Sequence, residues 1–234
     1  MSNEDGSVWI TYNGEVYNHR ELRAELEAKG HVYRSGTDTE TIIHLYEEEG
    51  TACVERLKGM FAFAIWDARA GQLFLARDRL GIKPLYFAQP PGGFVFASEI
   101  KALLEHPAVR RDLNEEAFFH YLTFVCTPAP LTMFEGINKL APAERMVVRP
   151  DGRCETDIFW SPVSAQAHGQ VAGRSEQELR DQLLELLRIS IERRMMADVP
   201  FGVFLSGGVD SSTTAPHHSV LATSRGRSAG SRAT

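Results

Sequence analysis

The sequence predicts an α+β fold with a largely antiparallel sheet, followed by the beginning of an α/β region. Short β-prone segments succeed one another between residues 60 and 97 in hairpin order, and two helical segments precede them. After residue 175 the pattern changes to a long amphipathic helix, an apolar strand and a glycine loop, the order typical of nucleotide-binding domains. The 234 residues suffice for one large domain or two small ones.

Composition limits the functional class. Hydrophobic residues make up 43% and charged residues 24%, which is typical of globular proteins. The formal net charge of -6 gives no electrostatic attraction to nucleic acid or to anionic membranes. No apolar run approaches the roughly 20 residues of a membrane helix. Cys53, Cys126 and Cys154 have no CxxC spacing and fit reduced thiols, so we expect a cytoplasmic protein without nucleic-acid or membrane partners.

The first elements follow from local signals. Residues 8–12 are β-prone, and Asn13 and Gly14 then predict a turn. Asn18 is expected to cap a helix that ends at Gly30. The remaining predicted elements are a helix from 37 to 50, strands at 60–66, 72–76, 85–87 and 94–97, helices at 99–104 and 114–121, and a hairpin of 145–148 with 155–159.

A second region begins after residues 161–174, which are rich in Pro, Ala, Gly and Ser and predict an interdomain linker. Ser175 and Glu178 have the spacing of a capping box. Apolar residues then recur every four positions, as a long amphipathic helix requires: Leu179, Leu183, Leu187, Ile191 and Met195. Residues 199–205 predict a short strand buried in a parallel sheet.

The loop after that strand is the sharpest single signal. Gly207 and Gly208 allow a tight turn that exposes backbone N–H groups, and Ser206, Ser211 and Ser212 add hydroxyl donors. Together they predict a phosphate cradle, although the GxxxxGK[ST] pattern of a Walker A loop is absent. The alternative is a Gly-Gly turn in which Asp210 caps a helix.

Five further segments occur in order before this loop. They are YNGEVYN (12–18), SGTDTE (35–40), GMFAFAIWD (59–67), RDRLGIKPLY (77–86) and FASEIKAL (96–103). They resemble the glutamine amidotransferase domain of class II, N-terminal-nucleophile enzymes, and specifically that of glutamine-hydrolysing asparagine synthetases. The resemblance covers residues 2–212. It implies a four-layer αββα domain over residues 1–160, and over 175–215 the start of a doubly wound ATP-pyrophosphatase domain.

For the glycine loop, the resemblance is to the SGGxDS loop of ATP-pyrophosphatases, which holds the phosphates of ATP. It implies an ATP site formed by Leu205, Ser206, Gly207, Gly208, Asp210, Ser211 and Ser212. Asp210 would also bind Mg²⁺. The expected cofactors are therefore ATP and Mg²⁺.

In the amidotransferase part, the family chemistry is attack of a thiolate on the side-chain amide of glutamine. The resemblance implies that the Asn13 side chain and the Gly14 N–H form the oxyanion hole. Glu15 and Asp38 would hold the amino-acid end of glutamine, since carboxylates suit its ammonium group. Without the neighbouring motifs, Asn13 and Gly14 would be a plain turn and Asp38 a helix-start residue.

Four charged residues of the fourth motif are left outside the predicted site. Arg77, Asp78, Arg79 and Lys83 allow two interpretations, contact with a ligand or a structural cluster of charges, and the second is at least as well supported.

The nucleophile of the family is a cysteine at the mature N-terminus. Residue two here is Ser2, and we expect Met1 to be an internal methionine of a fragment that lacks the first strands. Residues 216–234 begin with a proline and continue in Ser, Arg, Ala and Gly without hydrophobic period, so we expect a disordered tail. Such a fragment is expected to be inactive alone.

The resemblance implies ATP-dependent amidation of L-aspartate to L-asparagine with nitrogen from L-glutamine, releasing AMP and pyrophosphate. It also implies a possible homodimer of the full-length protein. Two alternatives stay open: a related amidotransferase that acts on another carboxylate acceptor, and an inert gene fragment.

Overall fold

The computed structural model describes residues 1–163, 173–196, 202 and 204–213. The chain divides into two compact units, Met1–Pro162 and Val163–Thr234, which are treated separately. The predicted linker and tail lie largely or wholly outside the described residues, as does most of the strand expected at 199–205. Of that strand, Gly202, Phe204 and Leu205 are described and do not belong to a strand.

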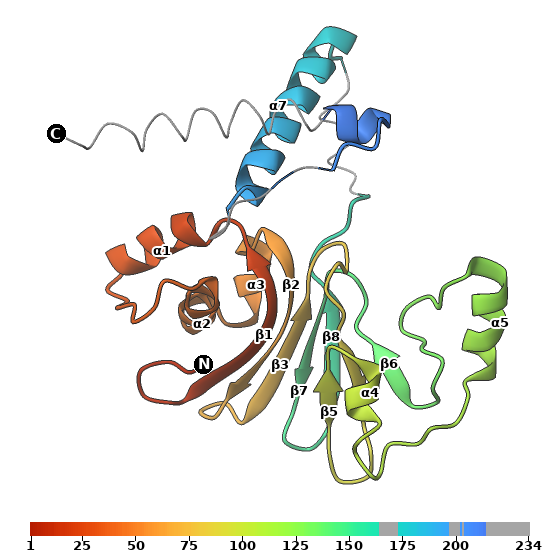
Figure 1. Cartoon of the computed structure of the whole chain (residues 1–234). Helices are drawn as coiled ribbons and strands as arrows, with labels where there is room; N and C mark the ends of the chain where they lie inside the picture. The colour runs from red at the N-terminus through yellow and green to blue at the C-terminus, as the bar shows by residue number, and fades with distance from the viewer. Residues whose placement is uncertain (164–172, 197–201, 203, 214–234) are drawn as a thin grey trace. The chain divides into compact units, whose positions relative to one another are not determined.

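The first unit is organised around a five-stranded antiparallel sheet in the order β1-β2-β3-β7-β8 (Figure 1). β1 is an edge strand of this sheet. The strands are β1 (Val8–Val16), β2 (Gly59–Asp67), β3 (Gln72–Arg77), β7 (Glu144–Val148) and β8 (Cys154–Ile158).

A second, three-stranded antiparallel sheet has the order β5-β4-β6. Its strands are β4 (Tyr86–Ala88), β5 (Val95–Ala97) and β6 (Ile137–Lys139). β6 was not predicted, because three residues are too short for a period-two pattern to stand out. Its pairing with β4 joins segments about fifty positions apart in the sequence.

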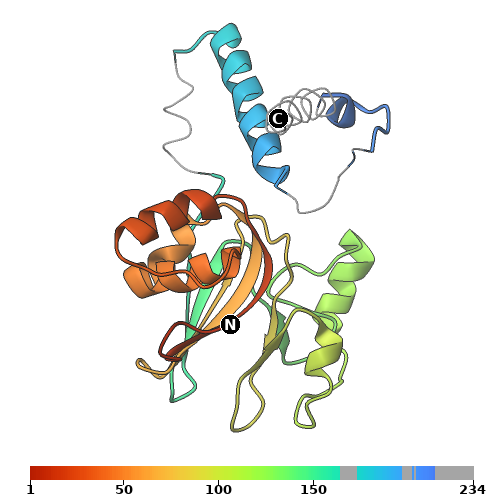
Figure 2. The same ribbon diagram turned by 60° about the vertical axis from the view of Figure 1, so that its left-hand side comes forward.

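Helices cover the outer face of the larger sheet (Figure 2). They are α1 (His19–Ala28), α2 (Asp38–Glu49) and α3 (Cys53–Arg56), with a 3-10 turn at Gly50–Ala52. α2 begins after Thr37 and ends at Gly50, as predicted. Its residues Ile42, Ile43 and Leu45 are buried against the sheet. These side chains form one apolar core with Phe61, Phe63 and Phe74 of the sheet.

The inner face of the larger sheet packs on the smaller sheet. Ala64, Leu75 and Met146 of the larger sheet share a core with Leu85 and Phe87. The far face of the smaller sheet is covered by α4 (Ile100–Leu103), whose Leu103 packs with Ala88 and Ile137; α5 (Glu115–Phe124) follows it along the chain. The order of layers is therefore helices, sheet, sheet, helix, and the predicted α+β class with antiparallel sheets is confirmed.

The turn predicted at Asn13 and Gly14 is wrong. β1 continues through both residues to Val16, with Asn13 opposite Ala62 and Gly14 opposite Phe61. An added Cβ at Gly14 would lie 2.3 Å from the carbonyl oxygen of Met60, so the two strands approach too closely for a side chain. Glycine here serves close approach of two strands rather than a turn.

Asn18 occupies the N-cap position of α1, but its side chain makes no capping hydrogen bond. It donates instead to the Arg56 carbonyl oxygen at 3.0 Å and accepts from the Lys58 N–H at 2.9 Å. Asn18 thus fixes the start of α1 against the segment that leads into β2.

The described part of the second unit contains α7 (Glu176–Arg194). The predicted capping box is present: Ser175 Oγ accepts from the Glu178 N–H at 3.3 Å, and Glu178 Oε2 accepts from the Ser175 N–H at 2.8 Å. Among the described residues, no helix is both long enough and apolar enough to cross a bilayer.

Candidate functional site: β1 and the glycine loop

The predicted glutamine site is built on β1, whose side chains alternate between the two faces of the sheet. Val8, Ile10 and Val16 are buried in the core beneath the helices. Asn13 and Glu15 therefore belong to the opposite face, which looks toward the smaller sheet. The core side chains of β1 thus lie on one face of the strand, and its candidate functional side chains lie on the other.

The Asn13 side chain lies in a pocket of about 140 Å³ between the sheets. Ala62 and Ala64 of β2 form one wall, and Phe96, Ala97 and Ser98 form the other. Asn13 Nδ2 donates to Ser98 Oγ at 3.4 Å. Because the alanine side chains on β2 are small, they leave space in which the Asn13 carboxamide can contact a ligand. Sequence reasoning did not find Ser98, because its place at the pocket depends on the packing of the two sheets.

The outer edge of β1 supplies backbone donors. The Val16 N–H donates to Asp38 Oδ2 at 2.8 Å, and the Ile10 N–H donates to the Met1 carbonyl oxygen at 2.9 Å. In an antiparallel ladder, every second residue directs its N–H away from the partner strand. Gly14 lies in the same alternation as Ile10 and Val16, so its N–H also faces the outer edge and away from β2.

Asp38 is the first residue of α2, and its carboxylate contacts β1 twice. Oδ2 accepts from the Tyr12 hydroxyl at 2.6 Å as well as from the Val16 N–H. Burial, and next the hydrogen bond to Asp38, raise the pKa of Tyr12 well above its usual range. The Tyr12 hydroxyl therefore stays protonated and holds Asp38 beside residues 12–16. Asp38 therefore contacts β1 on its helix-covered side and at its outer edge, whereas Asn13 and Glu15 lie on the opposite face of the strand.

His19, the first residue of α1, was missed by the sequence analysis. Its imidazole lies within range of the Asp38 charge, yet burial lowers its pKa below the ordinary value. Among the described residues, its buried Nδ1 has no hydrogen-bond partner. The only sequence signal was its position directly after the YNGEVYN motif.

The thiols lie elsewhere. Cys53 is fully buried, and burial raises its pKa far above that of a free thiol. Burial also raises the pKa of Cys154 on β8, and Cys126 is exposed. None of these three cysteines lines the pocket that holds Asn13. The described residues thus offer no thiolate beside the candidate oxyanion hole.

Two charged residues of the RDRLGIKPLY motif, Arg77 and Asp78, make structural contacts. Arg77 donates to three carbonyl oxygens, those of Lys83 and Gly81 at 2.7 Å and that of Leu140 at 2.5 Å. Asp78, which is 1% exposed, accepts from four backbone N–H groups at 2.9–3.2 Å. Of the two interpretations of this motif, these contacts favour the structural one.

The glycine loop turns tightly into a helical segment at residues 209–213. Gly207 has φ +79°, a conformation that suits glycine, and a Cβ at Gly208 would meet Ser206 Oγ at 3.5 Å. The hydroxyls of Ser206 and Ser211 lie 2.9 Å apart, and the Ser212 N–H donates to the Gly208 carbonyl oxygen at 3.0 Å. Leu205 and Asp210 flank this turn and are exposed. The loop therefore presents hydroxyls around a glycine turn at the start of a helix, which fits phosphate oxygens.

Two family models match this chain. Residues 1–160 match the family model of the glutamine amidotransferase domain, and residues 182–218 match that of asparagine synthase. The chain belongs to the glutamine amidotransferase family. The amidotransferase match includes the whole β1 region with Asn13 and Asp38, and the asparagine synthase match includes the glycine loop.

The curated relatives of this chain include proteins named asparagine synthetase and one named amidase. It is 36% identical over 91% of its length to "Asparagine synthetase [glutamine-hydrolyzing] 1" of Bacillus subtilis, of which it covers 33%. It is 34% identical over 91% of its length to "Amidase chry2" of Gibberella zeae, of which it covers 31%. The chain thus spans about a third of the length of these relatives.

Among solved structures, the chain is similar to the glutamine phosphoribosylpyrophosphate amidotransferase of B. subtilis. The identity is 21% with a TM-score of 0.48, covering 69% of this chain and 31% of that one. These values are too low to bear on function.

Proposed function

We propose that this chain is part of a glutamine-hydrolysing asparagine synthase. The complete enzyme would use ATP to amidate L-aspartate to L-asparagine with nitrogen from L-glutamine, releasing AMP and pyrophosphate. The observation that carries the proposal is the joint occurrence, in one chain, of the grouping around β1 and a serine–glycine phosphate loop. The identity of 36% to the B. subtilis enzyme over 91% of the chain supports it.

In the glutaminase half, Asn13 Nδ2 and the Gly14 N–H would stabilise the oxyanion that forms when a thiolate attacks the glutamine amide. Removing one such donor typically lowers the rate ~10²–10³-fold. Glu15 and Asp38 would bind the glutamine α-ammonium group, because a charge-assisted hydrogen bond to a carboxylate is strong. Tyr12 and the Val16 N–H would hold Asp38 in position for this task.

In the synthetase half, the loop of Leu205, Ser206, Gly207, Gly208, Asp210, Ser211 and Ser212 would hold the ATP phosphates. The missing Cβ at Gly208, beside two serine hydroxyls, gives a phosphate room to approach the backbone. Asp210, in the first turn of the helical segment, would contribute a carboxylate oxygen to Mg²⁺. The ion would neutralise charge on the phosphates while aspartate is adenylated.

The polypeptide of residues 1–234 is expected to bind glutamine without hydrolysing it. Its buried Cys53, its Cys154 on β8 and its exposed Cys126 all lie away from the pocket lining. Glutaminase activity of this purified polypeptide would contradict that expectation. The domain limits of 1–160 and 175–215, and a homodimer of the full-length protein, belong to the same proposal.

A second candidate is a related amidotransferase that amidates another carboxylate. What favours it is that a relative of similar identity, 34%, carries a name other than asparagine synthetase. Both candidates require the same glutamine and ATP sites. An inert fragment would have neither.

Titration calorimetry of the 234-residue chain tests the proposal. L-Glutamine should release heat in the wild type and lose most of its affinity in Asp38→Asn. That substitution keeps the side-chain oxygen that accepts from Tyr12 and Val16, so it removes charge with little change in structure. Glu4→Gln, an exposed carboxylate outside the site, is the control. If neither glutamine nor MgATP released heat on titration, the interpretation of the chain as an inert fragment would be the one that remains.

A further inference from the structure

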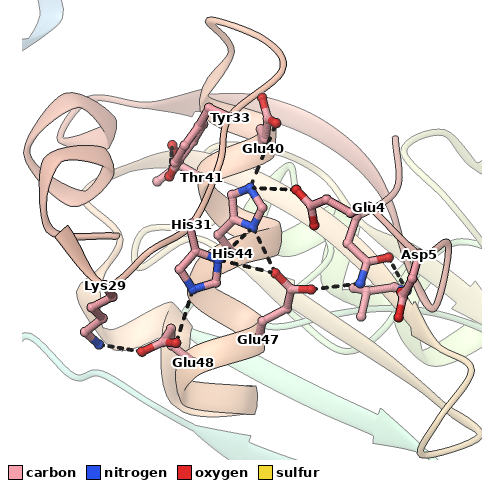
Figure 3. A network of polar contacts seen from close by, with 12 residues as sticks. Glu4, Asp5, Lys29, His31, Tyr33, Glu40, Thr41, His44, Glu47 and Glu48 are labelled. Atoms are coloured by element: carbon pink, nitrogen blue, oxygen red, sulfur yellow. Dashed lines mark hydrogen bonds and ion pairs between the residues drawn. The ribbon is translucent and has the colours of Figure 1, made fainter. Parts of the chain in front are cut away.

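A second group of chemically active side chains lies on the helix-covered side of the first unit. It consists of His31, after α1, together with His44 and Glu47 on α2, and is called the His31–His44–Glu47 cluster (Figure 3). His44 is 1% exposed, whereas the side chains of His31 and Glu47 are 16% and 20% exposed. The proposed glutamine and ATP chemistry uses none of these residues.

Three atoms of the cluster converge. His31 Nδ1 and His44 Nδ1 are 3.1 Å apart, His44 Nδ1 and Glu47 Oε2 are 2.9 Å apart, and His31 Nδ1 and Glu47 Oε2 are 3.8 Å apart. A triangle with these sides has a centre about 2 Å from each atom, close to the zinc–ligand distances of roughly 2.0–2.2 Å. An ion could therefore be bound there without moving the ligands appreciably.

The outward atoms of two ligands are also oriented as in metal sites. A metal-bound histidine usually donates its other ring N–H to a carboxylate. His31 Nε2 lies 3.1 Å from Glu48 Oε1, and Glu48 is held by Lys29 at 2.7 Å. Glu47 Oε1, the oxygen that does not face the histidines, accepts from Asn3 Nδ2 at 2.8 Å.

The surroundings of His44, the most buried of the three ligands, also fit an ion site. His44 Nε2 is buried without a hydrogen-bond partner among the described residues, and it faces Glu4 Oε1 at 3.7 Å and Glu40 Oε1 at 3.9 Å. If Nδ1 carried the only proton, the Nε2 lone pair would face two carboxylates. Coordination through Nδ1 places the proton on Nε2, where both carboxylates attract it.

We propose that the His31–His44–Glu47 cluster binds a divalent metal ion, Zn²⁺, through two imidazole nitrogens and one carboxylate oxygen. A water molecule would complete a tetrahedral shell, since zinc favours four ligands of this kind. The ion would join α2 to the segment after α1 and, through Asn3 and Glu47, to the N-terminal residues. Its role is structural, and it does not depend on the proposed asparagine synthase activity.

The test uses the full 234-residue chain, freed of metal with a chelator and titrated with Zn²⁺ against a chromophoric competitor. One ion should bind per chain and raise the midpoint of thermal unfolding, because it binds only the folded state. His31→Gln and Glu47→Gln should abolish this tight binding. Glu48→Gln, which leaves the three ligands in place but weakens the contact that orients His31 and removes the ion pair with Lys29, should weaken it about 10- to 100-fold.

Two controls define specificity. His120→Gln changes a histidine on α5 outside the cluster, and the double change His217→Gln with His218→Gln removes the neighbouring histidine pair near the C-terminus. Both variants should bind zinc as the wild type does. Cobalt added to the wild type should give the intense visible absorption of a tetrahedral site, a readout that needs no variant.

The proposal is overturned if no ion binds, or if His31→Gln and Glu47→Gln bind zinc like the wild type. Loss of binding only in the His217 and His218 variant would likewise overturn it. Circular dichroism of the metal-free variants separates lost binding from lost folding. If both ligand variants failed to fold, the stoichiometry and cobalt spectrum of the wild type would decide.

Discussion

The loop of residues 77–83 and the loop of residues 205–212 both carry a sequence motif, but they differ in where their polar groups point. In the first, Arg77 and the buried Asp78 direct their hydrogen bonds to backbone groups of the same unit. In the second, Ser206 is exposed and Ser211 is half-buried, and their hydroxyls bond to each other. Ser206 Oγ also accepts from the Gly208 N–H, and Ser211 Oγ donates to the Gly208 carbonyl oxygen. The first loop is tied to distant segments through Phe61 and Leu140, whereas the hydroxyl contacts of Ser206 and Ser211 named above lie within their own loop.

This difference teaches how a motif should be interpreted. A charged residue in a motif stabilises structure when its partners are backbone groups that would otherwise be unpaired. A polar residue in a motif is a candidate for binding when its partners lie within its own surface loop, where solvent or a ligand can replace them. Three substitutions test this distinction, from the largest expected effect to the smallest, and a fourth tests the buried imidazole of His19.

Asp78→Ala should destabilise the first unit most, by about 3–5 kcal/mol, because it leaves several backbone N–H groups without acceptors. Urea unfolding followed by tryptophan fluorescence measures this, since Trp9, Trp66 and Trp160 all lie in the first unit. Asp112→Ala, at an exposed carboxylate, is the control and should have a much smaller effect. Equal effects of the two substitutions would remove the structural role given to Asp78.

Arg77→Lys should lower the free energy of unfolding by about 2 kcal/mol. An ammonium group cannot reach the carbonyl oxygens of Gly81, Lys83 and Leu140 together, as the planar guanidinium does. The same urea experiment applies, with Arg153→Lys at an exposed position as its match. A wild-type unfolding curve for Arg77→Lys would show that this loop is not held by the guanidinium.

Gly208→Ala should leave the unfolding of the first unit unchanged within about 0.5 kcal/mol. The new Cβ would be in ordinary contact with Ser206 Oγ at 3.5 Å, so the fold tolerates it. The same methyl group would occupy the approach of a phosphate, and we expect MgATP binding to weaken about tenfold, or ~1.4 kcal/mol. Calorimetry measures the affinity, and unchanged affinity would argue against the phosphate cradle.

His19→Gln should have the smallest effect, a change in the pH dependence of stability. Burial holds the pKa of folded His19 below the value of 6.5 for an unfolded histidine. The unfolded chain therefore binds more protons at mildly acidic pH, and stability falls as pH decreases below about 6.5. His19→Gln should flatten this part of the profile in urea unfolding between pH 7.5 and 5.5. An unchanged slope would contradict a neutral folded His19.

Much of the local structure could be predicted from the sequence. The helix Asp38–Glu49 and the capping box of Ser175 were found because their signals lie within a few neighbouring residues. Of the strands expected before residue 160, all formed within a residue or two, apart from β1, which continues four residues farther. The three-residue β6 escaped prediction because its strand character comes from pairing with β4.

The sequence by itself determined which segments are helical or extended and which motifs place the chain in its family, because these depend on propensity, period and spacing. Only the tertiary structure decided that Asn13 and Gly14 lie within a strand, that Asp78 is structural, and that His31 meets His44. Those outcomes depend on strand pairing and packing between distant segments. No local signal encodes which backbone group or side chain a residue will meet across such a distance.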